Sequence, residues 1–264
     1  MNKTIKLVNC SPNNKSRKFC LKKDNLLEMK KKWNNKHPDT MIYSNNPTYI
    51  RKKLIQYSTY CYDELCLSKL YLSKKEISNL FSPECNWKKN YNNWLDGLDI
   101  LRVMKQYELK HREFKFLGPV PINFNNDTFP ELHKFNLRHY LKKNINKIGI
   151  VFNTDPHYRS GKHWICLFID LTNKFILFFD SNGIDMPKEI VVFVKKVLSQ
   201  SIKLNLNFEL YINKIQHQIT NGECGMFCLY VIIQLIDNCN INNIINQKIE
   251  TYDIEKNRNI YFNC

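Results

Sequence analysis

Two apolar runs separated by a short polar turn constrain the fold of this chain more than any other feature of its sequence. They lie in residues 161–183, GKHWICLFIDLTNKFILFFDSNG, on either side of Thr172 and Asn173. Short runs that are rich in β-branched and aromatic residues and end in turn residues are typical of buried strands. The segment therefore predicts two antiparallel strands joined by a turn.

The segments around this pair predict further layers. Residues 146–155 read as a preceding strand, and residues 208–215 as a following one. Residues 186–200 carry an apolar stripe at helical spacing and a proline in the first turn, which predicts an amphipathic helix. Residues 224–238 are apolar nearly all round, as in a buried helix. This order predicts an α+β fold in which a mixed sheet packs against a central helix.

The N-terminal third of the chain is predicted to be mainly helical. Residues 1–19 are polar and read as a flexible lead. Residues 20–33 place apolar side chains at helical spacing, and residues 51–72 form a second helical stretch. Residues 73–81 form a third helix that starts with a capping-box pattern.

A change of pattern places a domain boundary near residues 85–93. From Trp94 onward an apolar stripe predicts another helix, and Gly118 with two nearby prolines breaks the pattern that follows it. We therefore divide the chain into a basic, mainly helical N-terminal region, residues 1–90, and a second domain, residues 91–264.

The basic charge is concentrated in the first of these regions. The chain has 40 Lys and Arg against 24 Asp and Glu, a formal charge of +16, of which residues 1–90 contribute 19 − 7 = +12 and the remainder 21 − 17 = +4. A basic face can neutralise the phosphates of a nucleic acid or attract an acidic partner, although solvated lysines are the simpler interpretation. The candidates for phosphate contact are Lys22, Lys23, Lys30, Lys31, Lys32, Arg51, Lys52 and Lys53.

The N-terminus lacks the apolar core of a secretory signal, and the longest apolar run, Cys228–Ile236, is shorter than the roughly 18 residues that cross a membrane. We therefore expect a soluble, intracellular protein without membrane insertion. Thiols stay reduced in that compartment, so the 10 cysteines are expected to be buried thiols, ligands or a nucleophile rather than disulfides.

One of these cysteines stands where a nucleophile is favoured. Cys224 follows a loop that contains Gly222 and opens the predicted central helix, where free N–H groups and the helix dipole favour a thiolate. A thiol nucleophile also needs a base, and His163 is the best-placed histidine because it starts a predicted strand. Asp180 ends the neighbouring strand, so pairing of the two strands brings its carboxylate beside the imidazole, which it would orient.

A fourth residue completes the set. Gln218 lies six residues before Cys224 on the approaching loop, where its amide could donate to an oxyanion beside the backbone N–H of Cys224. Each of the four residues alone has an ordinary structural explanation, as a buried thiol, a turn residue or a solvated amide. Their joint order is more specific, since attack of a thiolate on an acyl carbon needs all four roles.

Two other histidines and a metal site are the alternatives for these residues. His157 and His217 flank the candidate groups, but both fall in predicted loops with no strand to fix them. A zinc site is an alternative because two cysteine pairs, Cys61 with Cys66 and Cys224 with Cys228, lie close together in the sequence. However, no paired Cys-x-x-Cys knuckle occurs, so buried thiols are favoured.

Other enzyme classes lack their motifs in this chain. There is no Gly-rich phosphate-binding loop and no His-Glu-x-x-His pair. The sequence therefore argues against a kinase, an ATPase, a dehydrogenase or a zinc-dependent metalloprotease.

Three sequence blocks carry a family resemblance. GKHWICLFID, FFDSNG and QHQITNGECGMFCL resemble the His-Trp, Asp and Gln…Cys-Gly blocks of the SUMO-protease and adenovirus-protease superfamily of cysteine peptidases. Within it, the resemblance is strongest to the capsid-maturation proteases of large cytoplasmic DNA viruses, of poxvirus, African swine fever virus and giant-virus type. It covers about residues 146–236 and extends back to Trp94.

The resemblance assigns roles that agree with those argued from the residues. It implies that Cys224 is the nucleophile, His163 the base, Asp180 the orienting residue and Gln218 the oxyanion donor, with no metal or cofactor. It also implies that two tryptophans lie at the substrate cleft, Trp164 after the histidine and Trp94 at the entrance with Leu95; an ordinary core aromatic is the alternative for Trp164. The chain departs from many eukaryotic members in having Glu223 where they have Asp.

The function that the resemblance implies is cleavage of viral core or capsid polyprotein precursors at Gly-containing sites, in the host cytoplasm and the virion. Two alternatives remain at this stage. One is an isopeptidase that removes SUMO-like or ubiquitin-like proteins. The other, of a different class, is a nucleic-acid-associated scaffold in which the basic region, 1–90, binds phosphates and the protease-like domain is degenerate.

Overall fold

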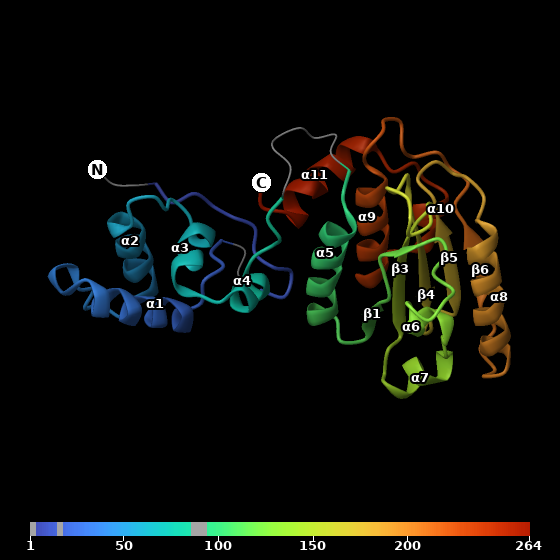
Figure 1. Ribbon diagram of the computed structural model, residues 1–264, viewed down its shortest axis with the longest axis horizontal. Helices are drawn as coiled ribbons and strands as arrows, with labels where there is room; N and C mark the ends of the chain where they lie inside the picture. The colour runs from blue at the N-terminus through green and yellow to red at the C-terminus, as the bar shows by residue number, and fades with distance from the viewer. Residues whose placement is uncertain (1–3, 15–17, 86–93) are drawn as a thin grey trace. The chain divides into compact units, whose positions relative to one another are not determined.

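The computed structural model describes residues 4–14, 18–85 and 94–264, which form two compact units (Figure 1). The helical unit comprises Met1–Asn86 with Asn259–Cys264, and the sheet unit comprises Trp87–Arg258. The predicted boundary falls largely on residues 86–93, outside the described residues. The predicted extent of the second domain needs one correction, because its last six residues belong to the helical unit.

A mixed sheet forms the centre of the sheet unit. Its strand order is β1-β3-β4-β5-β6, and β2 also pairs with β3. β3, β4 and β5 are antiparallel to one another, whereas β1 and β2 run parallel to β3 and β6 runs parallel to β5. The strands are β1 Phe114–Phe116, β2 Val120–Pro121, β3 Lys147–Asn153, β4 Trp164–Asp170, β5 Phe175–Phe179 and β6 Glu209–Ile212.

Helices cover the two faces of this sheet (Figure 1). On one face, α8 (Lys188–Ile202) packs its apolar stripe into a core that includes Ile148 and Ile150 of β3. On the other, α9 (Cys224–Ile236) contacts β4 and β3, with α5 (Gly97–Lys110) beside it. Gly149 permits this approach, because a Cβ there would lie 3.1 Å from Ile232 Cγ2 on α9. Short helices complete the chain: α6 Pro130–His133, α7 Leu137–Lys142, α10 Ile241–Ile245 and α11 Thr251–Tyr261.

The predicted α+β architecture, with a mixed sheet on a central buried helix, is confirmed. β1 and β2 were missed by the sequence prediction, because each is only two or three residues long and forms through parallel pairing with β3. Among the described residues, no helix is both long and apolar enough to cross a membrane.

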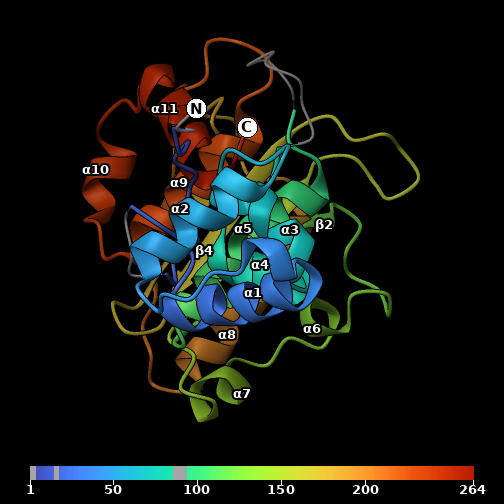
Figure 2. The same ribbon diagram turned by 90° about the vertical axis from the view of Figure 1, so that its left-hand side faces the viewer.

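In the described residues 4–14 and 18–85, the helical unit is built from the α-helices α1 to α4 and the short 3₁₀ turn η1 (Figure 2). The predicted stretch 51–72 is in fact two helices, because Asp63 accepts a hydrogen bond from Cys66 N at 2.7 Å and starts a new helix. The predicted capping box of Ser73 with Glu76 is present. The elements are α1 Lys23–Lys36, η1 Pro38–Thr40, α2 Pro47–Tyr57, α3 Glu64–Tyr71 and α4 Lys74–Leu80.

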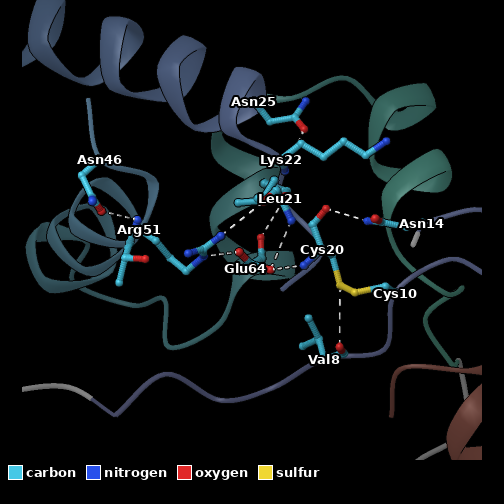
Figure 3. Close-up of polar contacts among 12 residues, drawn as sticks. Val8, Cys10, Asn14, Cys20, Leu21, Lys22, Asn25, Asn46, Arg51 and Glu64 are labelled. Atoms are coloured by element: carbon cyan, nitrogen blue, oxygen red, sulfur yellow. Dashed lines mark hydrogen bonds and ion pairs between the residues drawn. A yellow bond between two sulfur atoms is a disulfide. The ribbon is translucent and has the colours of Figure 1, made fainter. Parts of the chain in front are cut away.

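A buried ion pair joins three segments of this unit (Figure 3). Glu64 Oε1 lies 2.5 Å from Arg51 Nε, and Glu64 Oε2 accepts a hydrogen bond from Leu21 N at 3.2 Å. Arg51 in turn donates to Leu21 O at 3.2 Å. Both ionic side chains are buried. The prediction that Arg51 contacts phosphates is therefore wrong, since its guanidinium faces the interior.

The cysteines of the two units differ. Three disulfides, Cys10–Cys20, Cys61–Cys66 and Cys85–Cys264, lie in the helical unit, with Cα–Cα distances of 5.1, 5.4 and 5.2 Å that suit such a bond. The cysteines of the sheet unit are free thiols. The expectation of thiols throughout is therefore wrong for six of the ten, because spacing along the chain did not reveal which pairs meet in space.

The start of the chain is also more ordered than its composition predicted. Ser11 and Asn14 are buried, and Asn14 Nδ2 donates to Cys20 O at 2.7 Å. The expectation of a flexible lead over residues 1–19 is therefore wrong for the described part, residues 4–14 and 18–19.

Candidate active site

The strand register brings two predicted site residues to one edge of the sheet. His163 directly precedes β4 and Asp180 directly follows β5. Because the two strands are antiparallel and Cys166 pairs with Phe179, the start of β4 and the end of β5 lie side by side. Cys224 is the first residue of α9, which packs across β4. Three elements thus deliver a histidine, a carboxylate and a thiol to the same place.

The imidazole of His163 contacts both the carboxylate and the thiol. Its Nε2 lies 2.8 Å from Asp180 Oδ1, and it also forms a hydrogen bond with Cys224. Asp180 is itself held in place, because the same oxygen accepts a hydrogen bond from Asn182 N at 2.8 Å. With Nε2 committed to the carboxylate, Nδ1 is the ring nitrogen left for the thiol.

The electrostatics of this cluster favour a charged histidine. Burial by itself lowers the pKa of His163, but the hydrogen bonds to Asp180 and Cys224 and the negative charges of both outweigh it and raise the pKa from 6.5 to about 9. The imidazole is therefore protonated at neutral pH. An imidazolium beside a thiolate is the reactive state of thiol hydrolases.

The position of Cys224 combines a helix N-terminus with a close backbone contact. The residue is 2% exposed, and Trp164 N donates to its Sγ at 3.5 Å. The following residue must be small, since a Cβ on Gly225 would lie 3.1 Å from Leu95 Cβ and 3.2 Å from Trp164 Cδ1. Donors and the helix dipole at this end of α9 both stabilise negative charge on the sulfur.

Gln218 is buried on the loop between β6 and α9 and is fixed at both ends of its amide. Its Oε1 accepts a hydrogen bond from Ser181 Oγ at 2.8 Å, and its Nε2 donates to Thr220 O at 2.7 Å. The backbone N of Gln218 donates to Ser181 O at 2.9 Å. The residue is thus tied to the segment that directly follows Asp180. An amide nitrogen carries two hydrogens, so the bond to Thr220 leaves it a second donor.

Neither alternative base is placed for proton transfer with Cys224. His217 is fully buried, donates from Nε2 to Asn213 Oδ1 at 3.1 Å and accepts at Nδ1 from Ile249 N at 3.0 Å. Burial, with a smaller effect from the charge of Lys248, lowers its pKa to about 4, so it is neutral and structural. His157 is exposed and bonds through Nδ1 to Asn123 Nδ2 at 2.7 Å.

Both predicted cleft tryptophans line one cavity of the sheet unit, of about 440 Å³. Trp94 is 47% exposed on its wall, whereas Trp164 is buried and donates from Nε1 to Leu95 O at 2.8 Å. Trp164 follows His163 in the chain and touches the sulfur of Cys224 through its backbone N–H. The cavity therefore adjoins the histidine and the thiol through this residue.

Two structural partners of the site escaped the sequence prediction. Ser181 and Asn213 lie in turn or loop segments and carry no motif that marks them; only the proximity of Ser181 to Asp180 along the chain could have drawn attention to it. Asn213 is buried and donates from Nδ2 to Asp180 O at 2.8 Å.

The cysteines of the zinc alternative have other partners in the structure. Cys61 and Cys66 form a disulfide, and Cys228 forms a hydrogen bond with Cys166, where burial and this neighbour raise the pKa of its thiol. In the described ranges, no group of three or more His, Cys, Asp or Glu side chains is arranged to hold a metal ion.

Comparisons with known proteins agree with this geometry. Residues 122–264 match the model of the Ulp1 protease family, C-terminal catalytic domain. A thiol protease of Acanthamoeba polyphaga mimivirus is 30% identical over 170 residues, which are 64% of this chain and 56% of that relative. The SUMO-1 cysteine protease of African swine fever virus is 26% identical over 214 residues, 74% of this chain and 78% of the relative.

A solved structure has the same fold along almost the whole chain. The crystal structure of the African swine fever virus protease covers 98% of this chain and 97% of its own, with a TM-score of 0.71 and 19% identity. The resemblance stated from three sequence blocks is thereby confirmed. The chain belongs to the Ulp1 protease family and is a cysteine peptidase similar to thiol proteases of large DNA viruses.

Proposed function

We propose that this peptidase cleaves peptide bonds with Cys224 as nucleophile, His163 as acid and base, and Asp180 as the residue that orients the imidazole. One observation carries the proposal: the ring of His163 forms hydrogen bonds with both Asp180 and Cys224. This is the arrangement that an activated thiol needs, a nucleophile bonded to a base that a third group holds in place.

The steps follow from these positions. The Cys224 thiolate attacks the scissile carbonyl carbon, and the resulting oxyanion accepts hydrogen bonds from Cys224 N and the second N–H of Gln218 Nε2. The His163 imidazolium then gives its proton to the leaving amine, which departs and leaves a thioester. The neutral imidazole next takes a proton from water as the water oxygen attacks the thioester. Collapse of this second tetrahedral intermediate releases the carboxylic acid product and restores the Cys224 thiolate and the His163 imidazolium.

The substrate class that we favour is a viral core or capsid polyprotein precursor, cleaved at Gly-containing sites. The relatives from large DNA viruses support it, and so does a cleft with two indole side chains, Trp94 and Trp164, which leaves room for small residues next to the scissile bond. We place this activity in the cytoplasm of an infected host cell and in the virion.

Removal of a SUMO-like or ubiquitin-like protein is the second candidate. It is favoured by the name of the African swine fever virus relative, a SUMO-1 cysteine protease. Such modifiers end in glycines, so the same cleft would serve both substrate classes. The scaffold alternative with a degenerate protease domain has least support, because the bonded histidine, carboxylate and thiol are all retained.

A contact between nucleic acid and the helical unit is a further part of the proposal. Of the candidate residues, Lys22, Lys23, Lys31, Lys32 and Lys52 are exposed. Lys30 and Lys32 also bond backbone carbonyl oxygens of their own unit, at 3.0 Å and 2.7 Å. Affinity for a DNA duplex should fall steeply with added salt if lysines bind its phosphates.

The decisive experiment compares two probes on the full chain. A set of quenched peptides with Gly-containing sites is offered beside SUMO-1 and ubiquitin that carry a fluorogenic amide at their terminal glycine. We expect cleavage of the peptides by the unchanged protein and none by the Cys224→Ala variant. Turnover of the modifier probes alone would favour deconjugation. Cleavage that persists in Cys224→Ala would contradict the assignment of the nucleophile.

A further inference from the structure

We infer that Ser181 is a positioning residue for catalysis, because its hydroxyl donates to Gln218 Oε1 and so holds in place the amide whose Nε2 is to stabilise the oxyanion. The inference rests on the proposed function, in which Gln218 stabilises the tetrahedral intermediate. It adds a residue that carries no sequence motif and that touches neither the substrate nor the reacting atoms.

Ser181 holds the Gln218 loop through both its backbone and its side chain. It is 1% exposed and follows Asp180 directly. Its carbonyl oxygen accepts hydrogen bonds from His217 N at 2.7 Å and Gln218 N at 2.9 Å, and its Oγ donates to Gln218 Oε1 at 2.8 Å. The strand end that supplies the orienting carboxylate therefore also supplies the support for the oxyanion donor.

The hydrogen-bond partners determine the orientation of the amide. Thr220 O is a backbone carbonyl and can only accept, so the end of the Gln218 amide that faces it at 2.7 Å must be Nε2. Oε1 then faces Ser181, whose hydroxyl must act as the donor. In a reversed amide, Gln218 Oε1 would face Thr220 O, which is also an acceptor. The amide N–H would then donate to the serine hydroxyl.

Loss of the hydroxyl would leave the Gln218 amide held at Nε2 by Thr220 O but no longer held at Oε1 by Ser181. A buried carbonyl oxygen without a donor is unfavourable, so the amide would turn toward another donor. Each such turn takes the second N–H of Nε2 away from the oxyanion. The thiolate and its imidazolium would be unaffected, because Ser181 Oγ bonds Gln218 rather than His163 or Cys224.

The far end of the loop is tied to the nucleophile. Thr220 Oγ1 donates to Glu223 Oε2 at 2.8 Å, and Glu223 is the residue before Cys224. A continuous path of hydrogen bonds therefore runs from Ser181 through Gln218 and Thr220 to the start of α9. Gln218 is held between the residue after the orienting acid and the residue before the sulfur.

Two reagents that use the same thiolate separate this role from a general structural one. p-Nitrophenyl acetate acylates Cys224 through a tetrahedral oxyanion, whereas iodoacetamide alkylates it by displacement at a saturated carbon and forms no oxyanion. Removal of one oxyanion donor slows acyl transfer by about 10²–10³, and disorder of the donor should cost part of that, so we expect Ser181→Ala to slow acylation about tenfold. The alkylation rate should stay within about twofold of the unchanged protein, since the nucleophile keeps its charge.

Ser201→Ala is the matched control. Ser201 is 0% exposed in α8 of the same unit, and its Oγ also donates a hydrogen bond, which is partly buried, to Leu198 O at 2.8 Å. It loses a comparable contact away from the site, and neither rate should change. Should Ser181→Ala not fold, Ser181→Cys keeps the shape with a weaker donor and should fall between the two acylation rates.

A double-mutant cycle with Gln218→Ala completes the test. If Ser181 acts through Gln218, then Ser181→Ala should slow acylation no further once Gln218 is absent. Equal slowing in both backgrounds, or equal loss of acylation and alkylation, would overturn the inference. Acylation that Gln218→Ala leaves unchanged would overturn it together with the role of the glutamine. No Cys224-dependent acylation at all would instead count against the proposed function.

Discussion

A buried carboxylate that is paired with a nitrogen side chain occurs in each unit of this protein, and the two pairs have different consequences. In the helical unit, Glu64 lies 2.5 Å from Arg51; in the sheet unit, Asp180 lies 2.8 Å from His163. Arginine keeps its charge at all ordinary pH values, whereas histidine gains and loses a proton near neutrality. The first pair holds segments together, and the second is bonded to a thiol and can move a proton.

The largest effect should come from removing the imidazole of the second pair or the thiol that is bonded to it. We expect Cys224→Ala and His163→Ala each to lower kcat/KM for a cleaved peptide by about 10⁴-fold or more, because members of a catalytic set act as a unit. Asp180→Asn should be less severe, since the nucleophile and the base remain. Peptide cleavage with the folded state checked by circular dichroism measures this. A smaller loss in Asp180→Asn than in the two alanine variants, and no additivity between Cys224→Ala and His163→Ala, is the expected pattern. Full activity in either alanine variant would contradict it.

The helical unit should respond to the corresponding change with stability rather than rate. Arg51→Ala leaves the buried Glu64 carboxylate without its cation, and we expect a loss of about 3–5 kcal/mol in the free energy of local unfolding. Amide hydrogen exchange of α1 to α3 in the full chain measures it. The double variant Arg51→Met with Glu64→Gln removes both charges and should lose less. A larger loss in the double variant would contradict the ion-pair explanation.

The two pairs should also differ in their dependence on pH. The folded pKa of His163, about 9, exceeds its ordinary value of 6.5, so the stabilisation is complete below pH 6.5 and is lost as pH rises through about 9. A shift of this size corresponds to at most about 3 kcal/mol. The protection of amides near β4 and α9, measured relative to their intrinsic exchange rates, should therefore fall over this interval. It should change less with pH in His163→Gln. Arginine side chains stay charged at ordinary pH values, so we expect no such dependence from the pair in the helical unit.

The sequence predicted the sheet unit better than the helical unit, for physical reasons. β3, β4, β5 and α9 were predictable because each is a nearly continuous apolar run bounded by polar or turn residues. The helical stretch 51–72 was mispredicted as continuous, since its break depends on one capping carboxylate, Asp63. Arg51 was mistaken for a surface residue because its partner lies in another helix.

The candidate site divides in the same way. His163, Asp180 and Cys224 could be proposed because each marks the end of a recognisable element, and antiparallel pairing of two neighbouring strands then brings the first two together. Ser181 could not, because its role depends on a loop 37 residues further along the chain. Contacts between distant loops leave no local pattern in a single sequence.

The smallest expected effect concerns the cysteines, which separate the two units most sharply. Replacing Cys61 and Cys66 by serine opens a loop of only five residues, so we expect a loss of about 2 kcal/mol, confined to exchange in the helical unit. Cys239→Ser, at a free and partly buried thiol of the sheet unit, is the matched control and should change nothing.

Thiol titration of the denatured, unreduced chain should find four groups, since the other six form disulfides. Ten titrating thiols would show that the helical unit holds its fold by packing and its buried ion pair alone.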